Sequence, residues 1–414
     1  VGQLGDAALG GVAAVNRYYM IATFGTNGVL AAAAIFIAQY FGAKNMQKTK
    51  ESFRFSILCG FAIMIPFALS GLIFPELIVK FFTDDAAILQ QGVEYISVAA
   101  YTFFPMALSF SINNAFRACG ETKKPLIIVI LTALCNTALN YVLIFGHFGA
   151  PAMGVNGAAV ATVISRYLEL AIVAFWAHRH KEKFAFIRGL YRSLRIPVKL
   201  MGLFMTKVTP LILNEALWSI AITFQNQCYT TCGLAVVSAL NIVSTLNNMA
   251  TVAASAIGNT VGILMGQMLG AGNSVQQVRD TNRKLLALCL SSGIFFGILI
   301  TTVSGLFPRL YNTTEEVREL ATCFIWVISI MLPIASFTFA TYFTLRAGGK
   351  ALITFLFDSC FMWICAVSLA FCLSRFTGIS IIPLFTISQG TDLIKCVLGA
   401  FMLKQGKWIQ NLTV

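Results

Sequence analysis

Long apolar stretches separated by short polar segments recur along the whole chain. A stretch of about 20 apolar residues spans the hydrocarbon core of a bilayer as a helix. Lipid offers backbone groups no hydrogen-bond partner, so such segments must form helices or closed barrels. Because the apolar runs are continuous rather than alternating, they predict helices. We expect eleven of them, at residues 7–40, 53–74, 92–114, 124–145, 155–177, 205–229, 235–268, 284–306, 317–343, 352–373 and 380–402.

The sequence also contains an internal repeat. The stretch Gln39–Asn45 (QYFGAKN) returns as Gln267–Asn273 (QMLGAGN), 228 residues later, and Pro105 and Pro333 are separated by the same 228 residues. Two copies of one membrane unit are a common plan for a transporter, with the substrate path at the seam between the copies. The sequence therefore predicts an all-α, polytopic membrane protein made of two pseudo-symmetric helix-bundle lobes. We place the N-lobe at 1–177, an interlobe linker at 178–204 and the C-lobe at 205–414.

Composition supports the membrane assignment, and the distribution of charge predicts which side of the membrane each loop faces. Of the 414 residues, 58% are hydrophobic and 11% are charged, against roughly 25% charged in soluble domains. The net charge is +13, and most Lys and Arg follow alternate helices. By the positive-inside rule these segments are cytoplasmic, as is the C-terminus. The excess charge thus reflects topology and anionic lipid, not nucleic-acid binding.

This orientation leaves eleven helices split five plus six, so one helix of a twelve-helix plan is expected before Val1. No cleavable signal peptide is recognisable at the N-terminus. The eleven Cys and three His are not spaced as a disulfide framework or a zinc site. We expect no cofactor, and we expect the Cys to be core residues with free thiols.

Two features of the polar and proline positions have open interpretations. The linker 178–204 interleaves basic residues with apolar ones, which fits either an amphipathic segment on the inner leaflet or a plain connection between lobes. Pro105 and Pro333 lie inside predicted helices, where proline removes a backbone hydrogen bond and bends the helix. They are candidate hinges or static kinks.

Several segments, taken in order, resemble the multidrug and toxic compound extrusion (MATE) family of transporters. The two repeated loops resemble those after the second and eighth helices of the family. The segment Arg117–Lys123 resembles the loop before the fifth helix, Asn136 to Gly146 the fifth helix, and Pro210–Glu215 the seventh. Gly2–Gly5 resembles the exit from the first helix, and Lys407–Ile409 a common ending. The resemblance implies twelve helices in two lobes around a central cavity, and export of amphipathic, often cationic compounds against inward H⁺ or Na⁺.

Acids inside membrane helices are costly and are therefore candidates for function. Glu215 lies about ten residues into the predicted helix 205–229, where the resembling family has a functional Glu. Asp358 enters the same lobe at a comparable depth, so the two carboxyls are a candidate pair for a shared proton or a Na⁺ site. For Asp358, an acid near the inner headgroups is an equally open interpretation.

Other polar residues at these depths have weaker claims. Asp392 and Lys395, and likewise Arg166 and Glu169, are spaced i,i+3 on one helix face, which favours structural ion pairs. The candidate cavity or substrate residues are Asn136, Asn140, Asn214, Gln225 and Asn241.

The resemblance has gaps. Asn140 stands where one branch of the family titrates an Asp, and an amide does not titrate. Ala335 stands about where another branch has an Asp on the tenth helix. The choice between H⁺ and Na⁺ therefore stays open.

We expect a secondary active antiporter rather than an enzyme, monomeric, in the plasma membrane and in contact with lipids and small amphipathic substrates. The alternative is a flippase for lipids or polysaccharide precursors with a related fold. A flippase predicts Arg residues inside the cavity, and few Arg lie within the predicted helices, among them Arg17 and Arg166.

Overall fold

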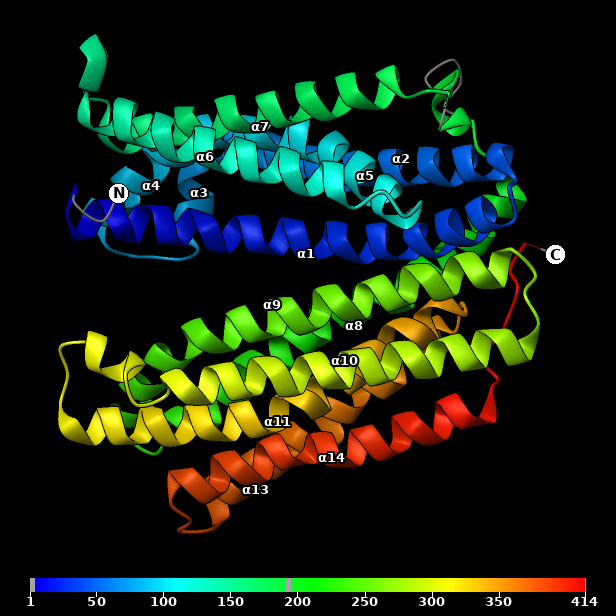
Figure 1. Ribbon diagram of the computed structural model, residues 1–414. Helices are drawn as coiled ribbons and strands as arrows, with labels where there is room; N and C mark the ends of the chain where they lie inside the picture. The colour runs from blue at the N-terminus through cyan, green and yellow to red at the C-terminus, as the bar shows by residue number, and fades with distance from the viewer. Residues whose placement is uncertain (1–3, 183, 191–194, 414) are drawn as a thin grey trace. The chain divides into compact units, whose positions relative to one another are not determined.

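The computed structural model describes residues 4–182, 184–190 and 195–413, which form helices joined by short turns. These helices gather into two compact units. The N-lobe runs from α1 to residue 208, and the C-lobe comprises residues 42–44 and the chain from residue 209 onward. The elements of the N-lobe are α1 (Asp6–Gly42), α2 (Met46–Ile73), α3 (Pro75–Lys80), α4 (Ala86–Ala99), η2 (Ala100–Thr102), α5 (Phe103–Ala118), α6 (Lys123–Phe145), η3 (His147–Gly149), α7 (Gly154–Arg179) and η4 (Ala185–Ile187) (Figure 1).

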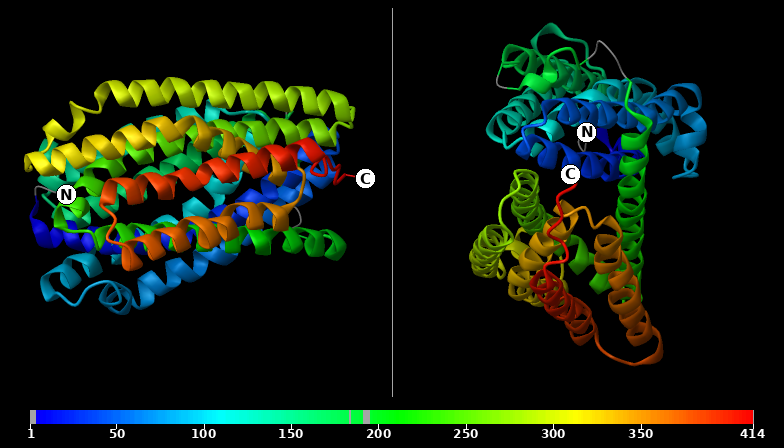
Figure 2. Two further views of the ribbon diagram at one scale, coloured as in Figure 1. Left: turned by 90° about the horizontal axis from the view of Figure 1, so that it is seen from below. Right: turned by 90° about the vertical axis from the view of Figure 1, so that its right-hand side faces the viewer.

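The C-lobe begins within a long helix, α8 (Val198–Thr230), whose first residues belong to the N-lobe. Its other elements are α9 (Leu234–Gly270), α10 (Val275–Val303), η6 (Phe307–Leu310), α11 (Glu315–Ala347), α12 (Ala351–Phe355), the π-helical turns η7 (Leu356–Cys360) and η8 (Met362–Val367), α13 (Ser368–Phe376) and α14 (Ile381–Gln405). A short turn connects α13 to α14, seen as the change from orange to red in Figure 2.

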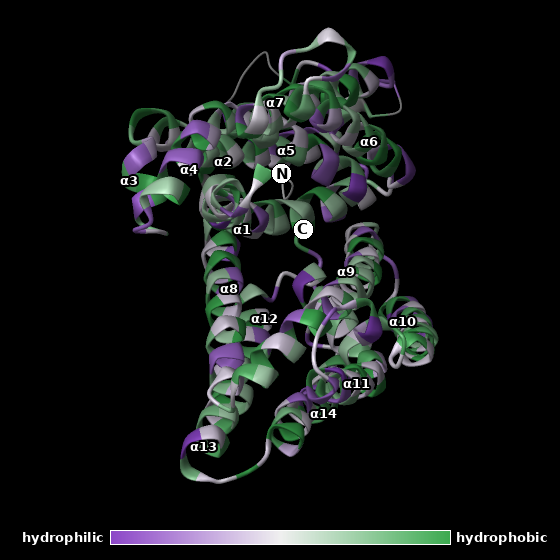
Figure 3. Ribbon diagram, turned by 90° about the vertical axis from the view of Figure 1, so that its left-hand side faces the viewer, coloured by the Kyte–Doolittle hydropathy of each residue, from purple (hydrophilic) through white to green (hydrophobic). Residues whose placement is uncertain are grey.

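The eleven predicted membrane helices are confirmed. Among the described residues, eleven helices are long and apolar enough to cross a membrane. Their ribbons are coloured mostly as apolar residues in Figure 3. Two predicted helices are not regular. The span 86–118 contains the 3₁₀ turn η2, and the span 351–376 contains the two π-helical turns.

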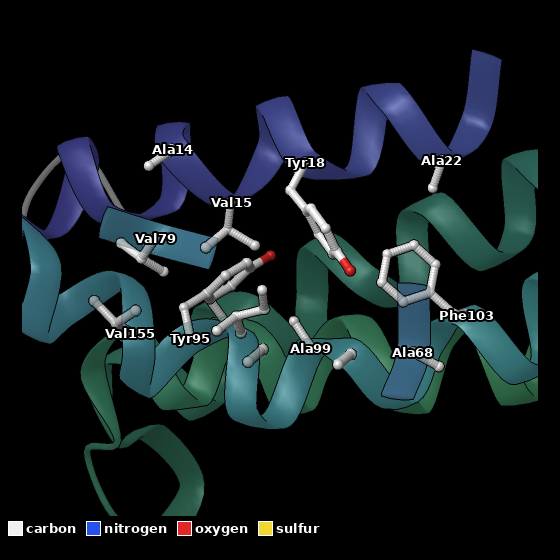
Figure 4. Packing of buried hydrophobic residues seen from close by; sticks show 14 of the residues in the cluster. Ala14, Val15, Tyr18, Ala22, Ala68, Val79, Tyr95, Ala99, Phe103 and Val155 are labelled. Atoms are coloured by element: carbon white, nitrogen blue, oxygen red, sulfur yellow. The ribbon is translucent and has the colours of Figure 1, made fainter. Parts of the chain in front are cut away.

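The N-lobe core is built from aromatic rings set among small residues. Tyr18 on α1 packs edge-on against Phe103 on α5, with ring centroids 5.9 Å apart (Figure 4). Its hydroxyl donates to the Phe67 carbonyl on α2 at 2.7 Å, so the buried phenol keeps a hydrogen bond. Ala14, Ala68 and Ala99 in the same cluster leave the space that these rings occupy.

The two candidate hinge prolines lie in different local structures. Pro105 lies in the first turn of α5, which follows the 3₁₀ turn η2 directly, so the helix is irregular close to the point where proline removes a backbone donor. The hydroxyl of Tyr19 hydrogen-bonds at this turn to the Ala99 carbonyl and the Thr102 hydroxyl. Pro333 lies inside α11, which stays α-helical on both sides of it. Whether either proline acts as a hinge stays a prediction.

Several apolar residues of the linker pack against protein where the structure describes it. Phe184, Phe186, Ile187 and Leu190 are buried, and the ring of Phe184 meets that of Phe116 on α5 at 4.8 Å. The exposed side chains here include those of the basic Arg179, Lys181 and Arg188 and that of the acidic Glu182. The predicted linker residues Lys183, Tyr191 and Arg192 lie outside the described residues.

A buried cation fastens this segment to the N-lobe. The Arg54 guanidinium on α2 donates to the backbone carbonyls of Leu190 at 2.9 Å and Gly189 at 3.1 Å. An unpaired buried guanidinium would be costly. These two bonds therefore favour the docked position of the linker over one in which its rings enter lipid.

In the C-lobe, a Gly-x-x-x-Gly pair lets α10 approach α11 closely. A Cβ atom on Gly293 would lie 2.6 Å from the Pro333 Cα atom, and one on Gly297 would lie 2.6 Å from the Ser329 carbonyl oxygen. Membrane helices lack a hydrophobic force that drives them together, so they depend on close packing of this kind.

We expect Gly297→Ala to destabilise the protein, because the added methyl would meet backbone rather than a movable side chain. The cost should be about 1–3 kcal/mol, as for other overpacked sites, and should lower the unfolding midpoint of purified protein in detergent. Gly390→Ala in α14 is the matched control, because nothing lies within 4 Å of its would-be Cβ atom. Equal midpoints for the two variants would contradict this account of the α10–α11 contact.

Candidate functional site

Glu215 is an acid in the middle of an apolar helix. It lies 15 residues from either end of the membrane-spanning stretch Leu200–Thr230, or about 22 Å at 1.5 Å per residue. This is deeper than the sequence predicted, because α8 begins at residue 198 rather than 205. Polar residues interrupt the apolar surface of α8 in Figure 3. The side chain is partly buried, and no described residue forms a hydrogen bond or salt bridge with its carboxyl.

Asp358, the second predicted coupling residue, already has partners. It lies in the π-helical turn η7, whose wider winding is often found at functional positions in helices. Its Oδ1 atom lies 2.6 Å from the Lys395 ammonium on α14, and both side chains are largely buried. Its Oδ2 atom accepts a hydrogen bond from the Asn214 amide at 3.0 Å. Asp358 is therefore part of a largely buried ion pair within the C-lobe.

Asn214 joins three helical segments around this ion pair. Its side chain is buried, with 2% exposed. Besides donating to Asp358, it donates to the Tyr342 hydroxyl on α11 at 3.3 Å, and its Oδ1 accepts from the Ser359 hydroxyl at 2.8 Å. These bonds use both amide N–H groups, so Asn214 positions Asp358; its role in a substrate cavity stays a prediction.

The predicted pair of Asp392 and Lys395 is wrong. Helical spacing places both on one face of α14, but the Lys395 ammonium pairs with Asp358 on the neighbouring segment instead. Asp392 is partly buried and forms no salt bridge with a described residue. Lys395 also lies 5.3 Å from the centre of the Phe357 ring, which adds a cation–π contact on the Asp358 side.

The predicted pair of Arg166 and Glu169 on α7 is confirmed. The two charged groups are 2.7 Å apart, and the Glu169 side chain is almost fully buried. The Asn113 amide on α5 donates to the other carboxylate oxygen at 3.1 Å. Glu169 is thus compensated by one base and one amide, as Asp358 is in the C-lobe.

The remaining predicted cavity residues are described within their own lobes. Asn136 and Asn140 on α6 bond to each other at 3.0 Å within the N-lobe, and the buried Oδ1 atom of Asn140 has no partner there among the described residues. Gln225 is buried and donates to the Ser388 hydroxyl at 2.7 Å, tying α8 to α14. Asn241 on α9 is exposed. Their role in substrate binding stays a prediction.

Sequence reasoning missed three members of the C-lobe network: Tyr342, Ser359 and Arg346. Arg346 is buried in the last turn of α11, and Arg346 and Asp358 are the charged groups that act on Glu215 electrostatically. The sequence alone did not show that Arg346 lies near Glu215. Across the described ranges, no three His, Cys, Asp or Glu side chains are grouped to hold a metal ion.

Comparisons with known proteins agree with this architecture. The sequence model of the MatE family matches residues 1–142 and 210–372. The chain is 26% identical over 397 residues to "Probable multidrug resistance protein YoeA" of Bacillus subtilis, covering 92% of this chain and 84% of that one. It is also 26% identical to "Probable multidrug resistance protein NorM" of Halalkalibacterium halodurans, covering 98% of this chain and 88% of that one.

Solved structures share the fold. The Vibrio cholerae MATE transporter VcmN in its bent form superposes with a TM-score of 0.87 at 19% identity, over 98% of this chain and 90% of that one. An outward-facing multidrug resistance MATE family transporter gives 0.84 at 15% identity, again over 98% and 90%. The resemblance read from the repeated loops and from Pro210–Glu215 is confirmed, and so is the expectation of a transporter rather than an enzyme. This multi-pass membrane protein belongs to the MATE family of transporters.

Proposed function

We propose that this protein exports amphipathic, chiefly cationic compounds in exchange for inward movement of H⁺ or Na⁺, and that Glu215 is the group that carries the coupling ion. The named relatives are multidrug resistance proteins, which supports the substrate class. The proposal includes a cytoplasmic C-terminus, from the distribution of Lys and Arg.

The single observation that carries the ion-coupling part is the state of the Glu215 carboxyl. It lies at the middle of the spanning stretch of α8, partly buried, with no described hydrogen-bond or salt-bridge partner. A carboxyl in such a place must gain a proton or a metal cation, or pay a large desolvation cost. By contrast, Glu169 and Asp358 already have bases at 2.7 and 2.6 Å, so they have less to gain from a mobile ion.

The inward ion supplies the energy for this exchange. One positive charge that moves inward across the membrane releases about 2.3 kcal/mol per 100 mV, and a monovalent cation that moves outward takes up the same amount. A one-for-one exchange is therefore driven by the concentration gradient of the ion, and the membrane potential contributes only when more charge enters than leaves. For that energy to reach the substrate, the loaded and empty forms of Glu215 must favour different access states of the transporter. A carboxyl without fixed partners meets this condition, since loading changes its net charge.

We expect Glu215→Gln to abolish concentrative export, because an amide neither takes up a proton nor attracts a cation. The measurement is extrusion of a fluorescent organic cation in everted membrane vesicles. Glu319→Gln is the matched control: Glu319 is an exposed Glu in the first turns of α11. Export by Glu215→Gln at the rate of the control would rule out the coupling role.

We also expect transport to depend on an imposed ion gradient. Purified protein in liposomes should move the fluorescent cation when either a pH gradient or a Na⁺ gradient is imposed alone, and the effective gradient identifies the ion. Collapsing that gradient with an ionophore should stop the accumulation. Equal fluxes with and without both gradients would indicate a passive pathway.

A further inference from the structure

Asp358 has the surroundings of a cation-binding carboxylate, and the ammonium group of Lys395 occupies the position of the cation. One carboxylate oxygen is 2.6 Å from the Lys395 ammonium, and the other is held by the Asn214 amide at 3.0 Å. The Ser359 hydroxyl and the Tyr342 hydroxyl hold Asn214 in turn. All of these groups lie within the C-lobe, and the Lys395 and Asp358 side chains are 12% and 14% exposed.

Two carboxyls act on Lys395 electrostatically: Asp358 in η7 and Asp392 on α14. Glu215 on α8 and Tyr342 on α11 interact with Asp358 in turn, and Arg346 on α11 interacts with both of them. Three of these are carboxyls, and the bases are Arg346 and Lys395. With every group ionised, the three negative and two positive charges leave one negative charge uncompensated.

We propose that Lys395 is a tethered counter-ion that occupies the cation position at Asp358 and so limits the C-lobe to one mobile monovalent cation. This inference deepens the proposed function, on which it rests for the identity of the mobile ion. Without the ammonium, Asp358 would become a second carboxyl open to H⁺ or Na⁺. Lys395 thereby sets how many cations the acids of this lobe take up.

Two features favour this role over a purely structural bridge between η7 and α14. First, the site already has neutral links between helices, such as the bond from Ser359 to the Asn214 carbonyl at 2.8 Å and that from Gln225 to Ser388 at 2.7 Å. Second, replacing a buried ion pair by neutral groups is often harmless to stability. The main effect of the Asp358–Lys395 ion pair, which lies close to the unpaired Glu215 carboxyl, is therefore on the net charge of this site rather than on stability.

The test counts cations bound by the purified full-length chain in detergent. Radiolabelled Na⁺ binding at equilibrium gives the Na⁺ count, and proton uptake on acidification from about pH 8 to about pH 5 gives the H⁺ count, a range in which Lys itself does not titrate. The variants are Lys395→Gln, which keeps a donor to Asp358 but removes the charge, Lys395→Arg, which keeps the charge, and the double variant Asp358→Asn with Lys395→Gln.

We expect Lys395→Gln to bind one more cation per protein than the wild type, as Na⁺ or as H⁺. Lys395→Arg and the double variant should return to the wild-type count. Lys395→Met should show the same gain. It introduces neither a charge nor an amide, so it controls for an effect of the glutamine amide itself. An unchanged count in both Lys395→Gln and Lys395→Met would overturn the proposal, as would a gain that persists in the double variant.

This outcome is separable from that of the coupling proposal. All of these variants retain Glu215, so the comparison between Lys395→Gln and the double variant reports on Asp358 alone. Undiminished export by Glu215→Gln would remove the coupling role of Glu215 and leave the count at Asp358 unaffected.

Discussion

The cost of holding a carboxylate inside a membrane bundle is the constraint on which this structure depends. Glu169, Glu215, Asp358 and Asp392 all lie within the described spanning helices. Glu169 and Asp358 solve the problem in the same way, each with one base closer than 3 Å and one Asn amide on the second oxygen. Glu169 and Asp358 therefore already have a compensating base. The acids without one among the described residues, Glu215 and Asp392, are the candidates for binding a mobile cation.

Much of the fold could be predicted from the sequence because lipid makes the hydrophobic pattern almost sufficient. With no water to satisfy the backbone, each long apolar run has to be a helix, and all eleven are present. The irregular places were not predictable in the same way. The π-helical turn at Asp358 does not alter the apolar pattern, since it rearranges hydrogen bonds within a stretch that remains helical.

The sequence indicated which charged residues lie inside the helices, but it did not reliably indicate which of them pair with one another. Spacing along a helix says which side chains share a face, and this sufficed for Arg166 and Glu169. It failed for Lys395, because an acid on another segment competes with the one three residues away, and only the tertiary structure decides between them. For the linker, the sequence left two interpretations open for a related reason. Interleaved basic and aromatic residues suit both a leaflet surface and packing against protein, and the hydrogen bond from the Arg54 guanidinium to the Leu190 carbonyl favours packing against protein.

The two lobes also differ in what their interiors offer an ion. In the described part of the N-lobe, the deep carboxyl of Glu169 is neutralised by Arg166, and the Asn136–Asn140 pair on α6 is uncharged. Amides can hold a cation by their oxygens, but they cannot exchange one charge for another. The C-lobe holds three carboxyls against two bases around Glu215. An imbalance of one charge in a low-dielectric interior is what a mobile cation would relieve, and in the described residues it arises on the C-lobe side. The internal repeat thus supplies two similar scaffolds, and side-chain charge makes them unequal.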